Sequence, residues 1–192
     1  MREAHIRGTL IEQVTAAYTD RPGALIVPEL ELCRGAARID LAVINRSLDG
    51  YEIKSERDTL RRLPSQVKAY GRVLNRVIIV CAQRHIDPVC TLVPSWWGIT
   101  EAASTGPGIR LRCLRAPLRN PSVDPIAVTQ LLWRGELLAE VGELQGPRGL
   151  SRQTRHQLGE ILVGELSVDD LSSRVGDRLR ARQGWRVPAL RA

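Results

Sequence analysis

The segment Val77–Ala82 constrains the fold more than any other part of this sequence. It is an uninterrupted run of six apolar residues, rich in β-branched side chains. A strand of this composition is buried on both faces, so its sheet must carry a packed layer on each side. We therefore expect a sheet covered by helices. The run is also the longest apolar stretch, and a membrane-spanning helix requires about 20 such residues, so we expect no transmembrane segment.

The segments before this strand alternate between helical and extended patterns. Residues 3–18 carry apolar side chains at helical spacing, with Glu3 on the apolar arc and Glu12 nearly opposite it. Three short strand candidates follow at Ala24–Cys33, Arg38–Ile44 and Tyr51–Ser55, after a turn at Arg21–Gly23. A second helix follows Asp58, with Pro64 in its first turn and an apolar stripe of Leu63, Val67, Tyr70 and Leu74.

The resulting order is helix, three strands, helix, strand, which predicts an α/β sandwich with a mixed central sheet. Further strands are expected at Pro94–Gly98 and Ile109–Leu114. We place this core in residues 1–120 and a small helical appendage in residues 121–192. The appendage is expected to hold three helices, one from Asp124–Pro125 to about Leu144, one capped by Ser151 and running through Glu165, and one from Ser167 to near Gly184.

The charge balance suggests a polyanionic partner. The chain carries 28 basic against 21 acidic residues, a net charge of +7, and its pI is near 9.9. Such a surface attracts phosphates, although an arginine preference of the genome explains the excess equally well. Only Lys54 and Lys68 are lysines, which draws attention to positions where a compact ammonium is kept. The four cysteines form no C-x-x-C pair and are expected to be reduced thiols of a cytoplasmic protein. The first five residues, Met1–His5, contain no hydrophobic signal segment.

Charged residues inside two of the expected strands predict a chemical site. Asp40 lies within Arg38–Ile44, and Glu52 and Lys54 share one face of the next strand because they are two residues apart. Acids embedded in apolar strands are costly unless they are paired or bind a metal. Two carboxylates and a backbone carbonyl, that of Ile53, form a hard oxygen site suited to Mg²⁺ or Mn²⁺. A lysine beside such a metal can orient the attacking water and offset phosphate charge.

This site requires a particular strand register. If Asp49-Gly50 formed a two-residue turn, Asp40 would lie on the opposite face from Glu52 and Lys54. A connection of odd length restores the shared face. We therefore expect a wide loop over about Asn45–Asp49, or a bulge, with Lys54 opposite Asp40 and Glu52 opposite Ala42.

The residues Asp40, Glu52-x-Lys54 and Gln66-x-x-x-Tyr70, in this element order, resemble the PD-(D/E)XK nuclease superfamily, in its RecB-like branch. The resemblance covers residues 3 to about 115. The stretch from Gly50 to Tyr70, with Trp96-Trp97-Gly98, is similar to a group of small uncharacterised bacterial proteins of that superfamily. The proline that names the superfamily is replaced by Ile39.

The resemblance implies a restriction-endonuclease-like fold and a role for each motif residue. Asp40 and Glu52 would hold the metal, and Lys54 would act on the water or on the scissile phosphate. Gln66 and Tyr70 would flank the site from the second helix, whose i, i+4 spacing places both on one side. Glu3 would match the first-helix carboxylate of this branch. Glu29 is a further acidic neighbour.

Each of these residues also has a structural interpretation. Asp40, Glu52 and Lys54 can form a cross-strand ion-pair cluster. Gln66 and Tyr70 can be packing residues, Glu3 a helix-dipole acid and Glu29 a strand-end acid. Trp96 and Trp97 suit either base stacking or the core. Nucleic-acid contacts are expected from Arg38 and from residues of or near the second helix, some of which can equally form a solvated face: Arg57, Arg61, Arg62, Lys68, Arg72 and Arg76.

These patterns lead to one functional prediction and two rivals. The prediction is a Mg²⁺-dependent nuclease that hydrolyses phosphodiester bonds of DNA, or of RNA, in the cytoplasm and without membrane association. The first rival is a catalytically inactive nucleic-acid-binding module or subunit on the same fold. The second is a structural protein whose basic surface reflects codon usage alone.

Overall fold

The computed structural model describes the chain except residues 1, 19–22, 107, 186–188 and 192. One sheet forms the centre, with the strand order β6-β5-β4-β3-β2-β1-β7. The strands are β1 (Leu25–Leu32), β2 (Ala37–Ile44), β3 (Leu48–Lys54), β4 (Arg76–Ala82), β5 (Gly98–Thr105), β6 (Gly108–Arg115) and the two-residue β7 (Leu190–Arg191). β3, β4 and β5 are parallel, and the remaining neighbours are antiparallel. The predicted α/β fold with a mixed sheet is confirmed.

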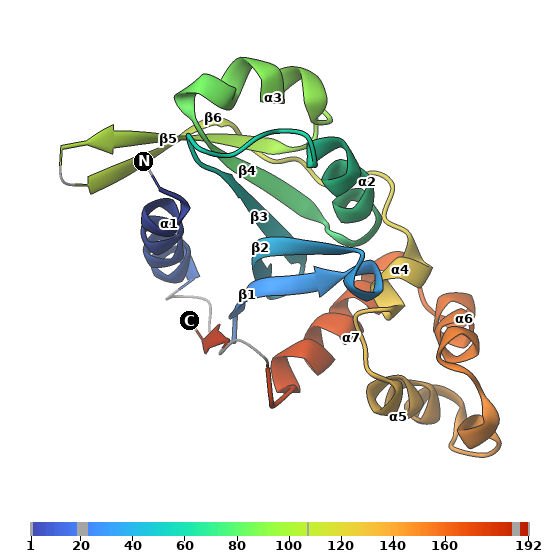
Figure 1. The fold of residues 1–192 in the computed structure, drawn as a ribbon. Helices are drawn as coiled ribbons and strands as arrows, with labels where there is room; N and C mark the ends of the chain where they lie inside the picture. The colour runs from blue at the N-terminus through green and yellow to red at the C-terminus, as the bar shows by residue number, and fades with distance from the viewer. Residues whose placement is uncertain (1, 19–22, 107, 186–188, 192) are drawn as a thin grey trace.

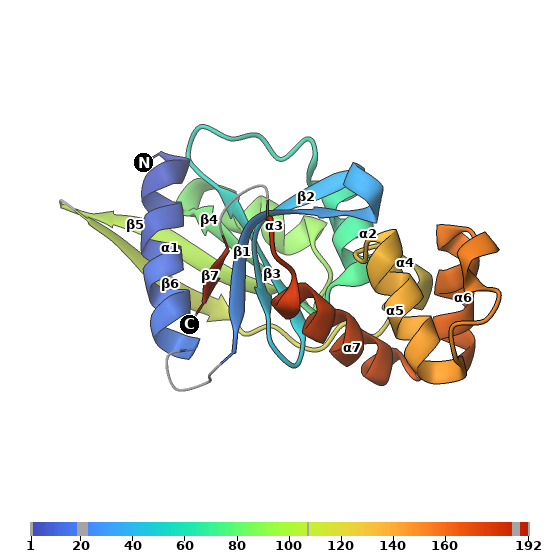
Figure 2. The same cartoon turned by 90° about the horizontal axis from the view of Figure 1, so that it is seen from below.

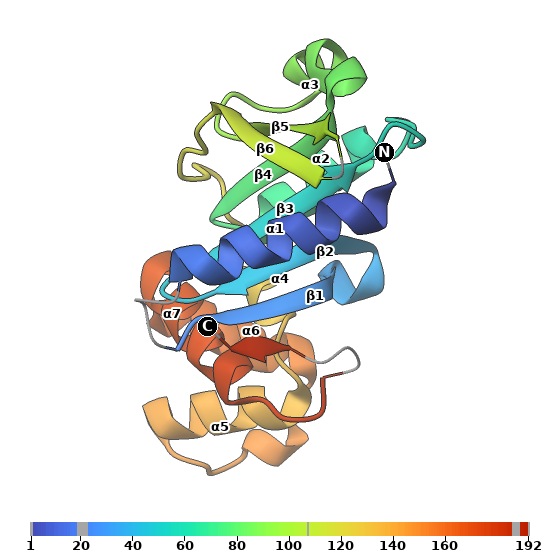
Figure 3. The ribbon, with the colours of Figure 1, turned by 90° about the vertical axis from the view of Figure 1, so that its left-hand side faces the viewer.

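Helices cover both faces of this sheet, as the apolar run in β4 requires (Figure 1). The helix α1 lies across one face (Figure 3), and α2 with the C-terminal helices packs on the other. The helices are α1 (Glu3–Tyr18), α2 (Leu63–Val73), α3 (Ile86–Leu92), α4 (Pro125–Thr129), α5 (Arg134–Gln145), α6 (Arg155–Glu165) and α7 (Val168–Ala181). None of these described helices has the length and apolar character that a bilayer crossing requires.

Two apolar cores hold the layers together. Between α1 and the sheet lie Ile6, Leu10 and Val14 of α1 with strand residues such as Ile53 and Val80. The core on the other face is larger and continuous with the C-terminal helices. It includes residues of the strands, of α2 and of α4 to α7, among them Leu25, Tyr70, Val77, Trp97, Val128, Leu158 and Val175. Figure 2 shows α5 and α6 beyond one end of the sheet, with α7 running back from them toward the strands. The division near residue 120 stays a prediction.

Several boundaries differ from the sequence-based expectation. Pro94–Trp97 is a turn and not the start of a strand, and the short helix α3 before it was not predicted. The turn places Trp97 in the core against Tyr70, so its apolar character reflects burial and not extended structure. The expected turn at Arg21–Gly23 lies largely outside the described residues. All four cysteines are free thiols, as predicted.

The C-terminal helices also differ in their limits. The helix expected from Asp124 to Leu144 is two helices, α4 and α5, because Trp133 takes the N-cap position of α5 and its backbone N–H donates to Glu136. Ser151 lies in a 3₁₀ turn and does not cap α6. Thr154 does, since its hydroxyl accepts from the Gln157 N–H while the Gln157 side chain accepts from the Thr154 N–H. Ser167 caps α7, as expected.

Candidate functional site

The connection between β2 and β3 determines which side chains meet. It comprises three residues, Asn45–Ser47, and pairs Ile44 with Leu48. The expected odd length is present, but the regular pairing of β2 with β3 ends at Leu41 and does not include Asp40. The expected register was wrong by two positions, because Gly50 and not Glu52 lies opposite Ala42. The strand begins early since the Leu48 N–H donates to the Asn75 side-chain oxygen at 2.8 Å, which holds that residue in the sheet.

The ladder between β1 and β2 is interrupted beside the predicted site. Pro28 pairs with Leu41 and Leu30 with Ile39, while Glu29 and Asp40 between them form no pair. Glu29 has a φ of 55°, the left-handed region that few non-glycine residues adopt. Such an irregularity re-aims side chains in the way of a β-bulge. It therefore frees the Asp40 side chain from the regular alternation of β2.

The Asp40 carboxyl contacts the segment of β3 that carries the motif. Its Oδ2 accepts a hydrogen bond from the Ile53 N–H at 2.7 Å. Because the N–H and C=O of a strand residue point toward the same neighbouring strand, the Ile53 carbonyl also faces β2. Burial, and then the negative charge of Glu52, raise the pKa of Asp40 to about 6, although the Ile53 N–H and Arg7 oppose the rise. The two carboxylates are thus close enough to repel each other.

Glu52 is the centre of a buried hydrogen-bond network on the α2 side of the sheet. Only 2% of its surface is exposed, and Oε1 accepts from Lys54 Nζ and from Gln66 Nε2, both at 2.6 Å. Oε2 lies 2.7 Å from the Tyr70 hydroxyl, which is also 2.7 Å from the Arg38 carbonyl oxygen. Burial and the Glu52 charge raise the pKa of Tyr70. The structure therefore brings together four of the five predicted catalytic residues in direct contact.

Glycine at position 50 makes this contact possible. A Cβ there would lie 2.5 Å from Leu74 Cδ1 and 3.1 Å from Ile39 Cγ1. The absence of that atom lets the end of α2 pack closely on β3. Tyr70, one turn earlier in α2, consequently reaches Glu52. Its ring is fixed from behind by Trp97, with ring centroids 6.1 Å apart.

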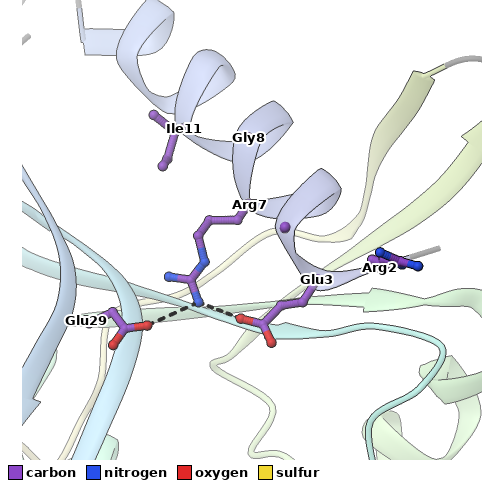
Figure 4. A pocket seen from close by; sticks show the side chains of 7 residues that line it. Arg2, Glu3, Arg7, Gly8, Ile11 and Glu29 are labelled. Carbon is purple, nitrogen blue, oxygen red and sulfur yellow. Dashed lines mark hydrogen bonds and ion pairs between the residues drawn. The ribbon is translucent and has the colours of Figure 1, made fainter.

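An arginine that the sequence analysis missed occupies the other side of Asp40. The Arg7 guanidinium donates to Asp40 Oδ1 at 3.1 Å and to its backbone oxygen at 2.9 Å. The Arg7 nitrogen that contacts Asp40 Oδ1, Nη2, also lies 2.5 Å from a Glu3 carboxylate oxygen and 3.7 Å from a Glu29 carboxylate oxygen (Figure 4). Glu3 and Glu29 therefore do lie beside the candidate site, held together by this cation. The i, i+4 spacing of Glu3 and Arg7 on the inward arc of α1 was the available signal.

A surface cavity of ≈ 630 Å³ opens beside this acidic cluster (Figure 4). Its walls come from the first turns of α1 and from the irregular part of β1, and include Glu3, Arg7 and Glu29. The cavity gives solvent a route to the α1 side of the site. Its lining includes Arg7, which contacts Asp40, and none of the residues of the buried Glu52 network.

The end of β3 is fixed just beyond Lys54. The N–H and hydroxyl of Ser55 both donate to Asp58, at 2.7 and 2.6 Å. The Ser55 carbonyl lies 3.0 Å from His85 Nε2, and His85 is buried. These bonds fix the backbone directly after the motif lysine, which is itself only 4% exposed.

The residues expected to contact nucleic acid remain at the surface. Arg38 is 62% exposed at its side chain and forms an ion pair with Glu29 at 3.2 Å. Exposed side chains also include Arg57, Arg61, Arg62 and Lys68. Arg72 and Arg76 have structural partners, in Asp124 at 2.7 Å and Asp49 at 3.5 Å. Trp97 is buried in the core, and the half-buried Trp96 packs edge-on against it.

The donor set fits a hard divalent cation, although the ligands are few. Within the described ranges no group of three or more histidine, cysteine or acidic side chains is arranged to hold a metal. Mg²⁺ needs only one or two carboxylates and keeps several waters. The pKa of Asp40 is raised first by burial and then by the charge of Glu52, and a nearby cation would oppose both effects. Gln66 Oε1, buried and without a hydrogen-bond partner in the described structure, is a further oxygen beside Glu52.

Comparison with known proteins places the chain in a phage protein family. Residues 1–184 match the family described as Bacteriophage P4 protein cII. The chain belongs to this family. It is 27% identical over 175 residues to Protein cII of Enterobacteria phage P4, a match that covers 89% of this chain and 64% of that relative. The chain thus spans less than two thirds of the length of this cII relative.

A solved structure also resembles this cII family chain. It is the SPO1766 protein of unknown function from Silicibacter pomeroyi, with 17% sequence identity and a TM-score of 0.46. The match covers 78% of this chain and 95% of that protein.

Proposed function

We propose that this cII family chain is a Mg²⁺- or Mn²⁺-dependent nuclease of the PD-(D/E)XK, restriction-endonuclease-like type that hydrolyses phosphodiester bonds of DNA. One observation carries the proposal. The buried Glu52 is bonded to Lys54, Gln66 and Tyr70 and lies close to Asp40, where the ladder of β2 is irregular. A plain ion pair of Glu52 and Lys54 does not require the two α2 side chains to converge on the same carboxylate.

The cation would be held by Asp40, Glu52 and the Ile53 carbonyl. When bound, it would supply Lewis-acid polarisation of the phosphate and a lower pKa of a coordinated water. Lys54 stands beside Glu52 and would orient the attacking water or offset charge on the phosphate. Gln66 and Tyr70 keep the Glu52 carboxylate in position. Arg38, with the exposed bases before and in α2, would contact the DNA backbone.

The position of Arg7 favours a second candidate, a non-catalytic nucleic-acid-binding module or subunit. Its guanidinium forms ion pairs with Asp40, Glu3 and Glu29 and so occupies the place that a bound cation would take. A chain that has lost metal binding would retain such a contact. A nuclease must let Arg7 withdraw from Asp40 when the metal arrives.

The test compares cleavage of labelled single- and double-stranded DNA in Mg²⁺, in Mn²⁺ and in EDTA. The variants are Asp40→Asn and, as a matched control, Asp49→Asn, which removes a buried acid at the start of β3, away from Glu52 and Lys54 at its end. The nuclease proposal requires metal-dependent cleavage that Asp40→Asn abolishes and Asp49→Asn retains. Cleavage that persists in EDTA or in Asp40→Asn contradicts it. Binding without cleavage under every metal condition favours the module.

A further inference from the structure

A second cavity is lined by residues of β1, including Glu29, and by residues of the C-terminal region beyond residue 120. Its volume is ≈ 380 Å³, within the range of small-molecule and nucleotide sites. Its walls include Leu30 and Arg34 near the β1–β2 turn and Gln130, Trp133, Arg155 and Trp185 beyond residue 120. The turn lies beside α4 in both views of Figures 1 and 2.

An aromatic platform forms one part of this cavity. The Arg182 guanidinium lies 4.3 Å from the Trp133 ring centroid and 4.9 Å from that of Trp185. Arg182 is fixed by Glu136, at 2.8 Å, and by the Leu131 carbonyl, at 2.8 Å. Trp133 nevertheless remains 52% exposed. The stack therefore holds the indole rigidly and leaves part of it accessible to a planar ligand.

The cavity also gathers positive charge that is incompletely compensated. Arg155 donates to the carbonyls of Gln130 and Leu132, at 2.7 and 2.5 Å, while its buried Nε has no hydrogen-bond partner among the described residues. Burial, followed by the charges of Arg34 and Arg182, lowers the pKa of Arg155. An anion placed near these guanidinium groups would relieve that repulsion.

The backbone around Arg34 is strained. Cys33 and Arg34 have φ values of 50° and 58°, and Gly35 follows at 84°. Left-handed conformations of non-glycine residues cost energy and gather at ligand-binding segments. Here the strain is accompanied by an arginine that lines the cavity.

Glu29 connects this cavity with the candidate active site, because it lines both cavities. Its carboxylate is engaged by Arg7 and Arg38, at 3.7 and 3.2 Å. These contacts reduce the repulsion that an acid in the wall would exert on an anionic ligand. Glu31 adds a second acid to the β1 wall.

We propose that this second cavity binds one nucleotide of single-stranded nucleic acid, with the base stacked on Trp133 and the phosphate near Arg34 and Arg155. The inference rests on the proposed function in one respect: if the chain is a nuclease, the substrate strand would pass Glu29 between this cavity and the candidate active site. Stacking on Trp133 requires a base outside a duplex, because the stacked bases above and below already cover both faces of a base inside one. Guanidinium groups suit phosphate because their planar fork donates two hydrogen bonds.

The test measures binding in EDTA, so that it is independent of cleavage. The probe is fluorescein-labelled dT12, with rU12 and a 12-base-pair duplex as parallel arms that separate DNA, RNA and paired strands. We expect Trp133→Leu to weaken dT12 or rU12 binding at least about fivefold, while Trp133→Phe retains most of it. Equal affinity of Trp133→Leu and the wild type overturns the proposal, as does tighter binding of the duplex than of both single strands.

Salt dependence tests the phosphate contact separately. Arg34→Gln should reduce the slope of log K against log salt by about 0.7 for a single strand. The matched control is Arg148→Gln, which removes an exposed arginine outside the cavity wall and should leave the slope unchanged. Identical slopes for the two variants exclude the assigned contact. Binding that follows these expectations without any metal-dependent cleavage keeps this inference and rejects the nuclease.

Discussion

Replacing Asp40 with asparagine should stabilise the protein at neutral pH. Asp40 has a folded-state pKa of about 6, raised from the usual 3.8 by burial and by the nearby Glu52. An acid with a raised pKa contributes most to stability when protonated, and this contribution is lost as the pH rises through 6. The rise of the pKa from 3.8 to about 6 corresponds to about 3 kcal/mol at pH 7.5. About 2 kcal/mol of this loss develops between pH 4.5 and 7.5.

Asparagine is nearly isosteric and cannot ionise, and its Oδ1 can still accept from the Ile53 N–H. The free energy of unfolding of Asp40→Asn should therefore exceed that of the wild type by up to about 3 kcal/mol at pH 7.5, or about 6–12 °C in Tm. The gain should shrink by about 2 kcal/mol at pH 4.5. Urea unfolding in EDTA, followed by tryptophan fluorescence, measures both values.

The control is Glu12→Gln, which neutralises a solvent-exposed acid of α1 and should change stability little at either pH. Adding Mg²⁺ should raise the unfolding free energy of the wild type but not that of Asp40→Asn. If Asp40→Asn is less stable than the wild type at pH 7.5, or if the difference does not vary with pH, the electrostatic reasoning is refuted.

Three further perturbations probe the same region. Tyr70→Phe leaves the buried carboxylate and carbonyl without their shared hydroxyl and should cost about 1–3 kcal/mol by urea unfolding, together with loss of cleavage. Gly50→Ala should destabilise by about 1–3 kcal/mol because its Cβ meets a side chain at 2.5 Å, whereas Gly8→Ala, with open space around it, should be neutral or stabilising; equal effects would contradict the packing argument. Arg7→Gln removes a charge that lowers the pKa of Asp40, so the carboxyl should titrate above pH 6 by NMR, and a lower value would argue against the contact.

Side-chain periodicity was sufficient to predict the layers of this fold. Val77–Ala82 is the buried strand β4, and the helical spacing of residues 3–18 matches α1. The requirement that Asp40 share a face with Glu52 predicted an odd connection between β2 and β3, and the connection is odd but shorter than the expected Asn45–Asp49. The register was missed because the Asn75 side chain, 27 residues beyond Leu48, draws Leu48 into the sheet. Such a contact leaves no local pattern in the sequence.

The sequence predicted the motif residues of the candidate site but not the residues that surround them. Gln66 and Tyr70 both reach Glu52, as their shared side of one helix suggested. The irregular pairing at Glu29 and the role of Arg7 depend on tertiary contacts between α1 and β1. Periodicity describes single elements, so it does not report what two elements bring together. The Trp133 platform was missed for the same reason.

The Tyr70 hydroxyl has one hydrogen and two oxygen acceptors at the same 2.7 Å separation, Glu52 Oε2 and the Arg38 carbonyl. Only one of them can receive it at a time. If a cation bound Glu52 Oε2, the Tyr70 hydroxyl would donate its hydrogen to the Arg38 carbonyl and would keep a partner. Replacing the Tyr70 hydroxyl by a cation as the partner of Glu52 Oε2 would therefore leave no hydrogen-bond donor unpaired. The buried carboxylate could bind the cation without any movement of the main chain.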